Sequence, residues 1–251
     1  MSKPTIRDLV SAEEWKVRMD LAACYRMVAR QNWHDLVYTH ISARVPGERH
    51  HYLVNPFGLH FHEITASSLV KVDDNCNVVL DTGFPVNPAA FVIHGAIHRA
   101  REDAGCVLHL HTVAGVGVAT QRQGLLPITQ TALLFEDNVA YHAYEGLAVA
   151  EGECERLVAD LGSKPAMLLQ NHGTLTVAET ISKAFVLMWF LERACQMQVA
   201  ALSGGAEFIV PPEDVRKRVR MQAAVSFQQA GIMEWAGVLR TLEREEPDYR
   251  N

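Results

Sequence analysis

The sequence lacks a long apolar segment and an apolar leader. Its longest strongly apolar run, Ala184 to Leu191, has eight residues before Glu192 and Arg193 interrupt it, whereas a membrane-spanning helix needs about 20. The first 31 residues carry charges throughout and contain no apolar stretch of the kind found in signal peptides. We therefore expect a cytoplasmic protein with no membrane partner.

An excess of positive charge and a cysteine framework are also missing. The 23 Lys and Arg residues against 29 Asp and Glu residues give a formal charge of −6, which argues against binding to nucleic-acid phosphates. The 5 cysteines are scattered, with no Cys-x-x-Cys pair, so neither a zinc ribbon nor a disulfide scaffold is indicated. The hydrophobic content of 49% is typical of a globular protein.

The chain reads as one α/β domain over residues 1–251, because no linker, repeat or low-complexity tract divides it. Four short apolar runs separated by turn residues predict an antiparallel meander. The strands that we expect cover 37–45, 52–56, 69–72, 78–80, 106–111 and 166–170. The helices that we expect begin at the capping box Ser11–Glu14, cover 88–101, 113–120 and 150–161, and begin again at Thr180 and Pro212.

The fold class that follows is a mostly antiparallel central sheet flanked by helices, with a C-terminal helical extension from about residue 212.

Histidine is unevenly distributed. All 12 histidines lie between His34 and His172, and the last 79 residues (251 − 172) have none. His109 and His111 alternate on a predicted strand, so their side chains project from the same face and can bind one metal ion. A polar strand face, or two buried histidines bonded to backbone, would show the same pattern.

A third histidine follows another predicted strand. In Asn171-His172-Gly173 the glycine permits a sharp turn that can aim His172 at a neighbouring strand end. A turn with no metal nearby would use the same three residues. From spacing alone the two alternatives stay open.

The order of these features resembles the class II aldolase/adducin family over about residues 15–202. The segments that carry the resemblance are Thr39–Arg44, Asn55–Gly58, the helix His94–Arg101, the His-x-His strand and Leu168–Gly173. Two further segments, Asn87–His94 and Ala140–Gly146, are similar to the adducin-like bacterial branch, part of which resembles metal-dependent decarboxylases.

The resemblance implies a three-layer α/β/α fold. It also implies that His109, His111 and His172 bind one divalent ion per subunit, with zinc favoured over manganese or iron, and that the protein is a homotetramer. Three histidines leave coordination positions open for a small-molecule substrate, as catalytic sites do. Such an ion would act as a Lewis acid on a substrate carbonyl.

Departures from the family pattern limit the substrate. The family's catalytic glutamate is missing, because its place falls on Ala90, and the serines of the phosphate pocket fall on Pro88 and Ala89. Thr39 and His40 replace a Gly-Asn pair, so that Gly58 alone remains of the family's phosphate pocket. Gly58 and Thr39 are the expected substrate-binding residues, and a phosphorylated substrate is disfavoured.

The sequence therefore predicts a metal-dependent carbon–carbon lyase acting on a small, non-phosphorylated hydroxy or keto acid, by aldol-type cleavage or decarboxylation. Decarboxylation needs an electron sink but no base, so it tolerates the loss of the glutamate better than aldol cleavage does. A non-catalytic adducin-like interaction module and a non-haem iron oxygenase are the alternatives.

Several side chains are candidates for the missing acid/base group. His142 and His40 are the catalytic candidates, against a surface or inter-subunit position for the first and a buried structural role for the second. His94 and His98, four residues apart, are expected on a solvated or interface face rather than as a second metal pair. Glu145 is a candidate partner of a ligand histidine.

Overall fold

The computed structural model describes residues 4–146 and 151–251, without the side chains of 88–91 and 151. Within these residues one eight-stranded sheet has the order β4-β3-β2-β1-β5-β8-β7-β6. Its strands are β1 (His40–Arg44), β2 (His51–Val54), β3 (Val70–Asp73), β4 (Val78–Leu80), β5 (Cys106–Leu110), β6 (Val139–His142), β7 (Ala166–Leu169) and β8 (Gly173–Ala178). The β6–β7 pair is parallel, and every other pair is antiparallel. The expected mostly antiparallel sheet is confirmed.

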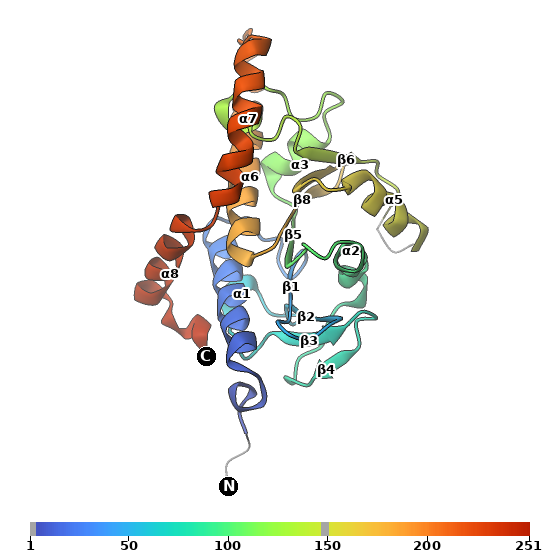
Figure 1. Cartoon of the computed structure of the whole chain (residues 1–251), viewed down its shortest axis with the longest axis vertical. Coiled ribbons are helices and arrows are strands. Elements are labelled where there is room, and N and C mark those ends of the chain that lie inside the picture. Colours follow the sequence, from blue (N-terminus) through green and yellow to red (C-terminus); the bar gives the residue numbers. More distant parts are fainter. Residues whose placement is uncertain (1–3, 147–150) are drawn as a thin grey trace.

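Helices cover both faces of this sheet (Figure 1). They are α1 (Ala12–Arg30), α2 (Pro88–Ala100), α3 (Val113–Ala119), α4 (Gln130–Leu133), α5 (Glu151–Leu161), α6 (Ile181–Ser203), α7 (Glu213–Gln229) and α8 (Met233–Glu245), with 3-10 turns at Ile6–Leu9, Phe61–Glu63 and Pro247–Arg250. One buried apolar cluster joins the sheet to α1 and α6, and a second joins it to α2 and α5. The three layers are those that the family resemblance implies.

Successive side chains of β1 point alternately toward these two helix layers. Ile41 and Ala43 belong to the cluster beneath α1 and α6. His40 and Ser42 therefore face the opposite side, where the Ser42 hydroxyl contacts side chains of α2. His40 lies directly across from His109 of β5 in the antiparallel ladder, so both side chains project toward the α2 layer.

Local signals account for most element boundaries. The hydroxyl of Ser11 accepts a hydrogen bond from the Glu14 backbone at 3.0 Å and caps α1. The full capping box was wrong, because the Glu14 carboxylate turns instead to Arg18 and Lys71. Thr180 caps α6 as predicted, through the backbone N–H of Lys183.

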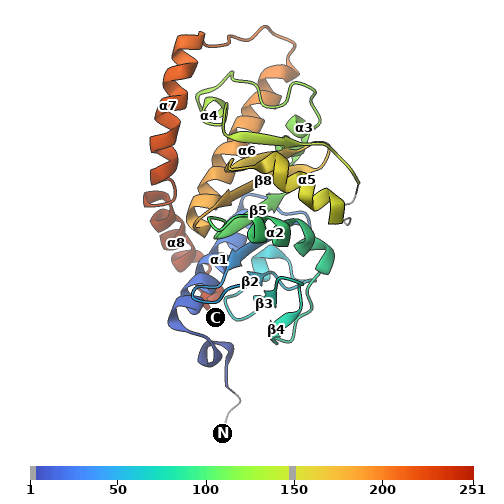
Figure 2. The ribbon, with the colours of Figure 1, turned by 45° about the vertical axis from the view of Figure 1, so that its right-hand side comes forward.

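Other boundaries differ from the sequence prediction. The strand expected from residue 37 begins at His40, because Leu36 and Thr39 have φ values of 51° and 66°, outside the extended region. Where one C-terminal helix was expected, the structure has two, α7 and α8 (Figure 2). The chain turns between them at Gly231, whose φ is +86°. Strands β6 and β8 were not predicted. Whether the segment after about residue 212 is a separate extension of one domain stays a prediction.

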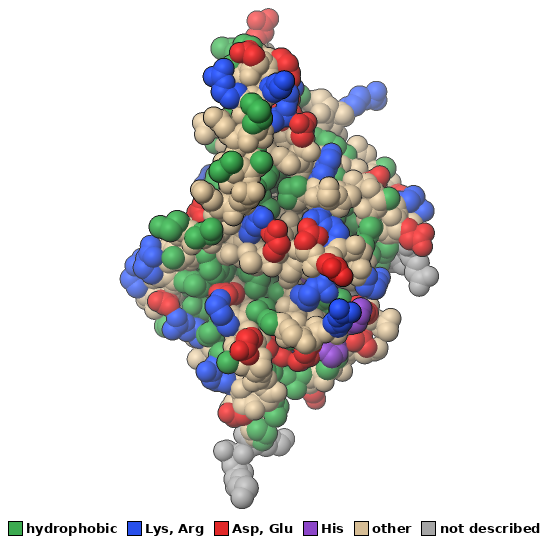
Figure 3. Space-filling model, in the orientation of Figure 1, with side chains coloured by type: hydrophobic (Ala, Val, Ile, Leu, Met, Phe, Trp, Pro, Cys, Tyr) green, Lys and Arg blue, Asp and Glu red, His purple; other side chains and the backbone are tan. Residues whose placement is uncertain are grey.

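The surface carries mixed charges. On the face drawn in Figure 3, acidic and basic side chains are interspersed and form no extended field of one sign. Among the described helices, none is both long enough and apolar enough to span a bilayer.

Candidate metal centre

Three histidines from different elements converge at one end of the sheet. His109 lies near the end of β5, His111 directly follows that strand, and His172 lies in the turn between β7 and β8. One ligand nitrogen from each ring lies within 4.8 Å of the other two. The Nε2 atoms of His109 and His111 are 3.1 Å apart, close to the spacing of two nitrogens that each lie about 2.0–2.1 Å from one ion.

Hydrogen bonds orient two of these rings. Nδ1 of His109 donates to the carbonyl oxygen of Thr174 at 3.0 Å, so the lone pair of the neutral ring is at Nε2. Nδ1 of His111 lies 3.2 Å from the carboxylate of Asp35. Partners of this kind fix the orientation of metal-binding imidazoles and raise their basicity. Asp35 was missed from the sequence, because nothing local joins it to a histidine 76 positions away.

The turn that carries His172 has no room for another side chain. Asn171 has a φ of 57°, a conformation that asparagine tolerates better than most residues. A Cβ added at Gly173 would lie 2.5 Å from the carbonyl oxygen of Leu110 and 3.0 Å from ring atoms of His109 and His111. Glycine at position 173 therefore lets the β8 backbone approach β5 closely enough to complete the cluster.

Burial keeps two of the three imidazoles neutral. Burial, followed by the charges of His172 and His111, lowers the pKa of His109 well below its ordinary value. Burial, followed by the charges of His111 and His142, lowers the pKa of His172 to about 4. Neutral nitrogens are what a cation requires of its ligands. The donor set, its convergence and the space kept free by Gly173 all fit a divalent ion.

One wall of the centre consists of polar groups at the start of β1 and just after the end of β2. Nδ1 of His40 lies 2.9 Å from Oδ1 of Asn55, and burial lowers the pKa of His40 to about 4. Thr39 and Asn55 are 3% exposed, yet Oγ1 of Thr39 and Nδ2 of Asn55 have no hydrogen-bond partner among the described residues. Such buried groups are usually satisfied by water or a ligand.

A second polar group lies beside His172. Nδ1 of His142 is 2.7 Å from a carboxylate oxygen of Asp160 on α5. His142 is 3% exposed, and its Nε2 has no partner among the described residues. The surface position considered for it was wrong, because His142 ends the β6 strand inside this chain.

Two other expectations were wrong. His94 and His98 are each 1% exposed rather than solvated, since α2 packs this helix face onto the sheet. Glu145 pairs with Arg156 instead of a ligand histidine.

The remaining candidate, Gly58, does not join the cluster. Gly58 lies on an exposed turn after β2 with a φ of +102°, and no hydrogen bond connects it to the three histidines among the described residues. Positions 88–90, where the family's serines and glutamate would fall, lie outside the described side chains.

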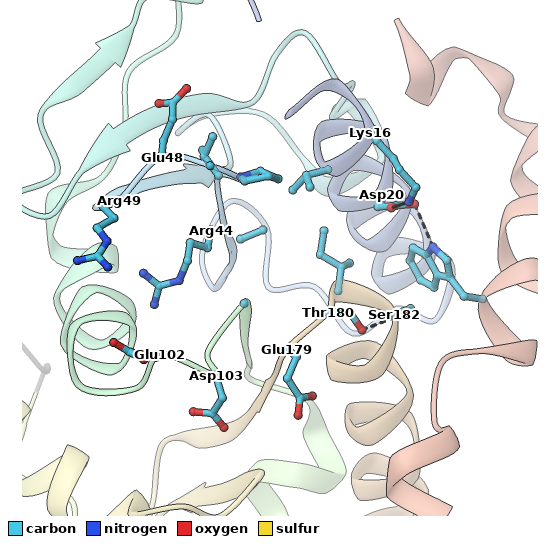
Figure 4. A pocket seen from close by; sticks show the side chains of 18 residues that line it. Lys16, Asp20, Arg44, Glu48, Arg49, Glu102, Asp103, Glu179, Thr180 and Ser182 are labelled. Carbon is cyan, nitrogen blue, oxygen red and sulfur yellow. Dashed lines mark hydrogen bonds and ion pairs between the residues drawn. The ribbon is translucent and has the colours of Figure 1, made fainter. Parts of the chain in front are cut away.

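A separate cavity of about 790 Å³ lies at the opposite end of the same strands (Figure 4). It is lined by residues where β1 ends and β5 begins, including Arg44 and Gly105, and by Glu179 just after β8. The guanidinium of Arg44 donates to the backbone carbonyls of His98 and Arg101, so Arg44 holds α2 and the segment after it against β1. The three histidines lie at the other ends of β5 and β8, so this cavity is not part of the metal centre.

Comparison with known proteins agrees with the fold. Residues 19–199 match the sequence model of the family described as Class II Aldolase and Adducin N-terminal domain. The chain belongs to this family.

Relatives extend over the whole chain. A crystal structure of an aldolase II superfamily protein from Pseudomonas syringae shares 48% identity and a TM-score of 0.94, over 98% of this chain and 99% of that one. The L-fuculose 1-phosphate aldolase from Glaciozyma antarctica shares 30% identity and a TM-score of 0.82, over 100% and 96%. Alpha-adducin of Mus musculus is 43% identical over 199 residues, which cover 77% of this chain but 27% of that protein.

Proposed function

We propose that this protein is a divalent-metal-dependent carbon–carbon lyase that cleaves a small, non-phosphorylated hydroxy or keto acid, by aldol-type cleavage or decarboxylation. The observation that carries the proposal is the convergence of His109, His111 and His172, with two of the rings oriented by Thr174 and Asp35. Three protein ligands leave positions for substrate. Zinc is the first ion to test, and manganese and iron are the alternatives.

The ion would polarise a substrate carbonyl and stabilise the negative charge left when a carbon–carbon bond breaks. The protein supplies the surrounding groups. Thr39 and Asn55 bring an unpartnered hydroxyl and an unpartnered amide N–H to the β1 and β2 side, where they can bind substrate oxygens. Their burial keeps competing water away from those hydrogen bonds.

Proton delivery is assigned to His142. Asp160 accepts a hydrogen bond from Nδ1 and so leaves Nε2 as the nitrogen available to a substrate beside His172. When His142 carries a second proton, the Asp160 carboxylate is its counter-charge. Nε2 can then return a proton to the carbanion carbon after cleavage.

The charge of the site disfavours a phosphate group on the substrate. A phosphate requires several donors and a positive field, whereas His40, in the place of the family's phosphate pocket, is neutral at pH 7 because its pKa is about 4. The relative from Glaciozyma antarctica is named for a sugar phosphate. For this chain we expect instead a carboxylate or a vicinal oxygen pair that binds the ion directly.

The first test is metal analysis of protein purified without added metal, with His111→Ala beside the parent protein. We expect about one ion per chain in the parent and loss of stoichiometric metal in the variant, whose fold stays intact because catalytic sites contribute less to folding than structural ones. His50→Ala, which removes an exposed histidine, is the matched control. Full metal occupancy in His111→Ala would overturn the assignment.

The second test is a substrate panel. Fuculose, ribulose and rhamnulose phosphates are compared with unphosphorylated hydroxy, keto and aromatic acids, each with zinc, manganese or iron. Turnover of a sugar phosphate at a typical enzyme rate of about 1–10³ s⁻¹ would contradict the proposal. Ala90→Glu restores the carboxylate, and aldolase activity that appears only in this variant would identify its loss as the cause.

An adducin-like interaction module is the second candidate, favoured by the 43% identity with alpha-adducin. A module without catalysis has no need for three converging imidazoles, so a parent protein that binds no metal would support it. An oxygenase would be indicated by iron as the bound metal together with oxygen consumption.

The assembly that we propose is a homotetramer. Apolar side chains are exposed around α6, α7 and α8, among them Phe208, Ile209 and Met233, which are 42%, 86% and 80% exposed. A monomer gains nothing from such exposure, while an interface buries it. Light scattering should give about four times the chain mass of 27.9 kDa, and a mass of one chain at micromolar concentration would contradict the proposal.

A further inference from the structure

Helix α2 carries a buried histidine over the wall of the metal centre. The His94 ring lies edge-on to that of His40, with centroids 6.2 Å apart, and His40 lies across from the ligand His109. Nδ1 of His94 is 2.7 Å from Oγ of Ser42, two residues along β1 from His40. His94 therefore lies over the β1–β5 pair, at the metal-centre side of Ser42.

A chain of hydrogen bonds fixes where the His94 proton resides. Nδ1 of His98 lies 2.8 Å from the carbonyl oxygen of Ala104 and must donate to it. Burial lowers the pKa of His98 to about 3, so this ring has only that proton and its Nε2 must accept. The single hydroxyl hydrogen of Ser42 therefore goes to His98, at 2.7 Å.

The position of the His94 proton follows from the same hydrogen bonds. With its hydrogen committed to His98, Ser42 can only accept from His94, so Nδ1 of His94 carries the hydrogen. Burial lowers the pKa of His94 well below its ordinary value, so the ring is neutral. Nε2 consequently holds a bare lone pair, and it is buried with no hydrogen-bond partner among the described residues. Both nitrogens of His98 are used, which excludes His94 and His98 as a second metal pair.

We propose that His94 is the proton acceptor of the metal centre, acting through Nε2, and that Ser42 and His98 are positioning residues that hold its tautomer. This inference rests on the proposed lyase function. Position 90, one helical turn earlier, is alanine and offers no group for the task.

For an aldol substrate, the reaction begins at the substrate hydroxyl. The Nε2 lone pair takes the proton of the substrate hydroxyl, the oxygen electrons form the new carbonyl, the carbon–carbon bond breaks, and its electron pair moves onto the second carbonyl group. The carbanion then takes a proton at carbon, and His94 releases its proton to solvent. For a keto acid that is not cleaved, Nε2 takes a proton from the carbon beside the carbonyl, and a solvent proton later replaces it.

The tautomer can be observed without metal or substrate. Long-range ¹H–¹⁵N spectra of the full chain with ¹⁵N-labelled histidine should show His94 protonated at Nδ1 and bare at Nε2. Ser42→Ala removes the acceptor of that proton, so His94 should become a mixture of both tautomers. A parent protein with the proton at Nε2 would overturn the inference, whatever the enzyme does.

The reaction is tested with pyruvate in D₂O and zinc-loaded protein, by following loss of the methyl proton signal. We expect His94→Gln to lower the exchange rate by about 10²–10⁴-fold with zinc content unchanged, Ser42→Ala to lower it less, and the exposed-residue control His50→Gln to leave it unchanged. If His94→Gln does not fold, Ser42→Ala decides through both its tautomer and its rate.

The outcomes separate the two hypotheses. Exchange by the parent protein and undiminished exchange by His94→Gln would overturn the role of His94 alone. Exchange by neither protein would overturn the proton-acceptor role of His94, while the metal analysis and the substrate panel decide the lyase proposal separately.

Discussion

Arg18 and Glu14 form an ion pair with almost no access to water. Nε of Arg18 is 2.9 Å from the Glu14 carboxylate, and their side chains are 0% and 2% exposed. Arg18 also donates to the backbone carbonyls of Ala66 and Leu69, and Lys71 lies 3.0 Å from Glu14. This network ties α1 to the segment that leads into β3, beneath the half of the sheet that supports His40.

Removing Arg18 leaves the buried Glu14 carboxylate with Lys71 but without its buried guanidinium, and it removes two hydrogen bonds to backbone carbonyls. We expect Arg18→Ala to lower the free energy of unfolding by about 3–5 kcal/mol, measured by urea denaturation. Lys16→Ala on the same helix is the matched control, because Lys16 is 73% exposed in its pair with Asp20 and such pairs contribute about 0–1 kcal/mol. Equal losses in both variants would contradict the importance of burial here.

Gly173 is expected to control assembly of the metal centre. In Gly173→Ala the new Cβ meets the Leu110 carbonyl at 2.5 Å, so β8 must move away from β5 and His172 moves with it. We expect loss of stoichiometric zinc and a destabilisation of about 1–3 kcal/mol. Gly204→Ala, where an added Cβ meets nothing within 4 Å, should change neither the zinc content nor the stability by a comparable amount.

Asp35 is expected to tune metal affinity through His111. Asp35→Asn removes the negative charge 3.2 Å from Nδ1 of that ring, which lowers the basicity of the ligand nitrogen. We expect zinc affinity to fall by about 10–100-fold, measured by competition with a chelator. The exposed Glu207 supplies a charge-matched control, and an equal effect of Glu207→Gln would show that net charge rather than the contact is responsible.

Acid should destabilise the fold through His98. Its pKa is about 3 in the folded protein, because burial disfavours the charged ring, against an ordinary value of about 6.5 in the unfolded chain. The unfolded chain binds more protons between these two values, so stability is lost as pH falls below about 6.5.

The contribution of His98 to this loss approaches about 1.4 kcal/mol per pH unit. Urea denaturation at several pH values should give a flatter pH dependence for His98→Gln than for the parent protein. Parallel curves would show that His98 stays neutral in the unfolded chain as well, or becomes charged in the folded one.

How much could be read from the sequence depended on how local each signal was. Strand alternation placed His109 and His111 on one face, and Asn171-His172-Gly173 predicted the turn that presents the third ring. Strand β8 was missed because it follows that turn directly, although Thr174 and Thr176 alternate with Leu175 and Val177 along it.

The sequence by itself determined the α/β class and the mostly antiparallel sheet, since each depends on periodicity or on turns of a few residues, and its resemblance to the family singled out the three histidines. The tertiary structure decided which groups serve them. Asp35 reaches His111 across 76 positions, and Ser42 reaches His94 across 52. Such pairs meet only when α2 packs on β1 and the loop before β1 lies against the end of β5, because packing of distant segments, rather than local spacing, sets which polar groups become neighbours.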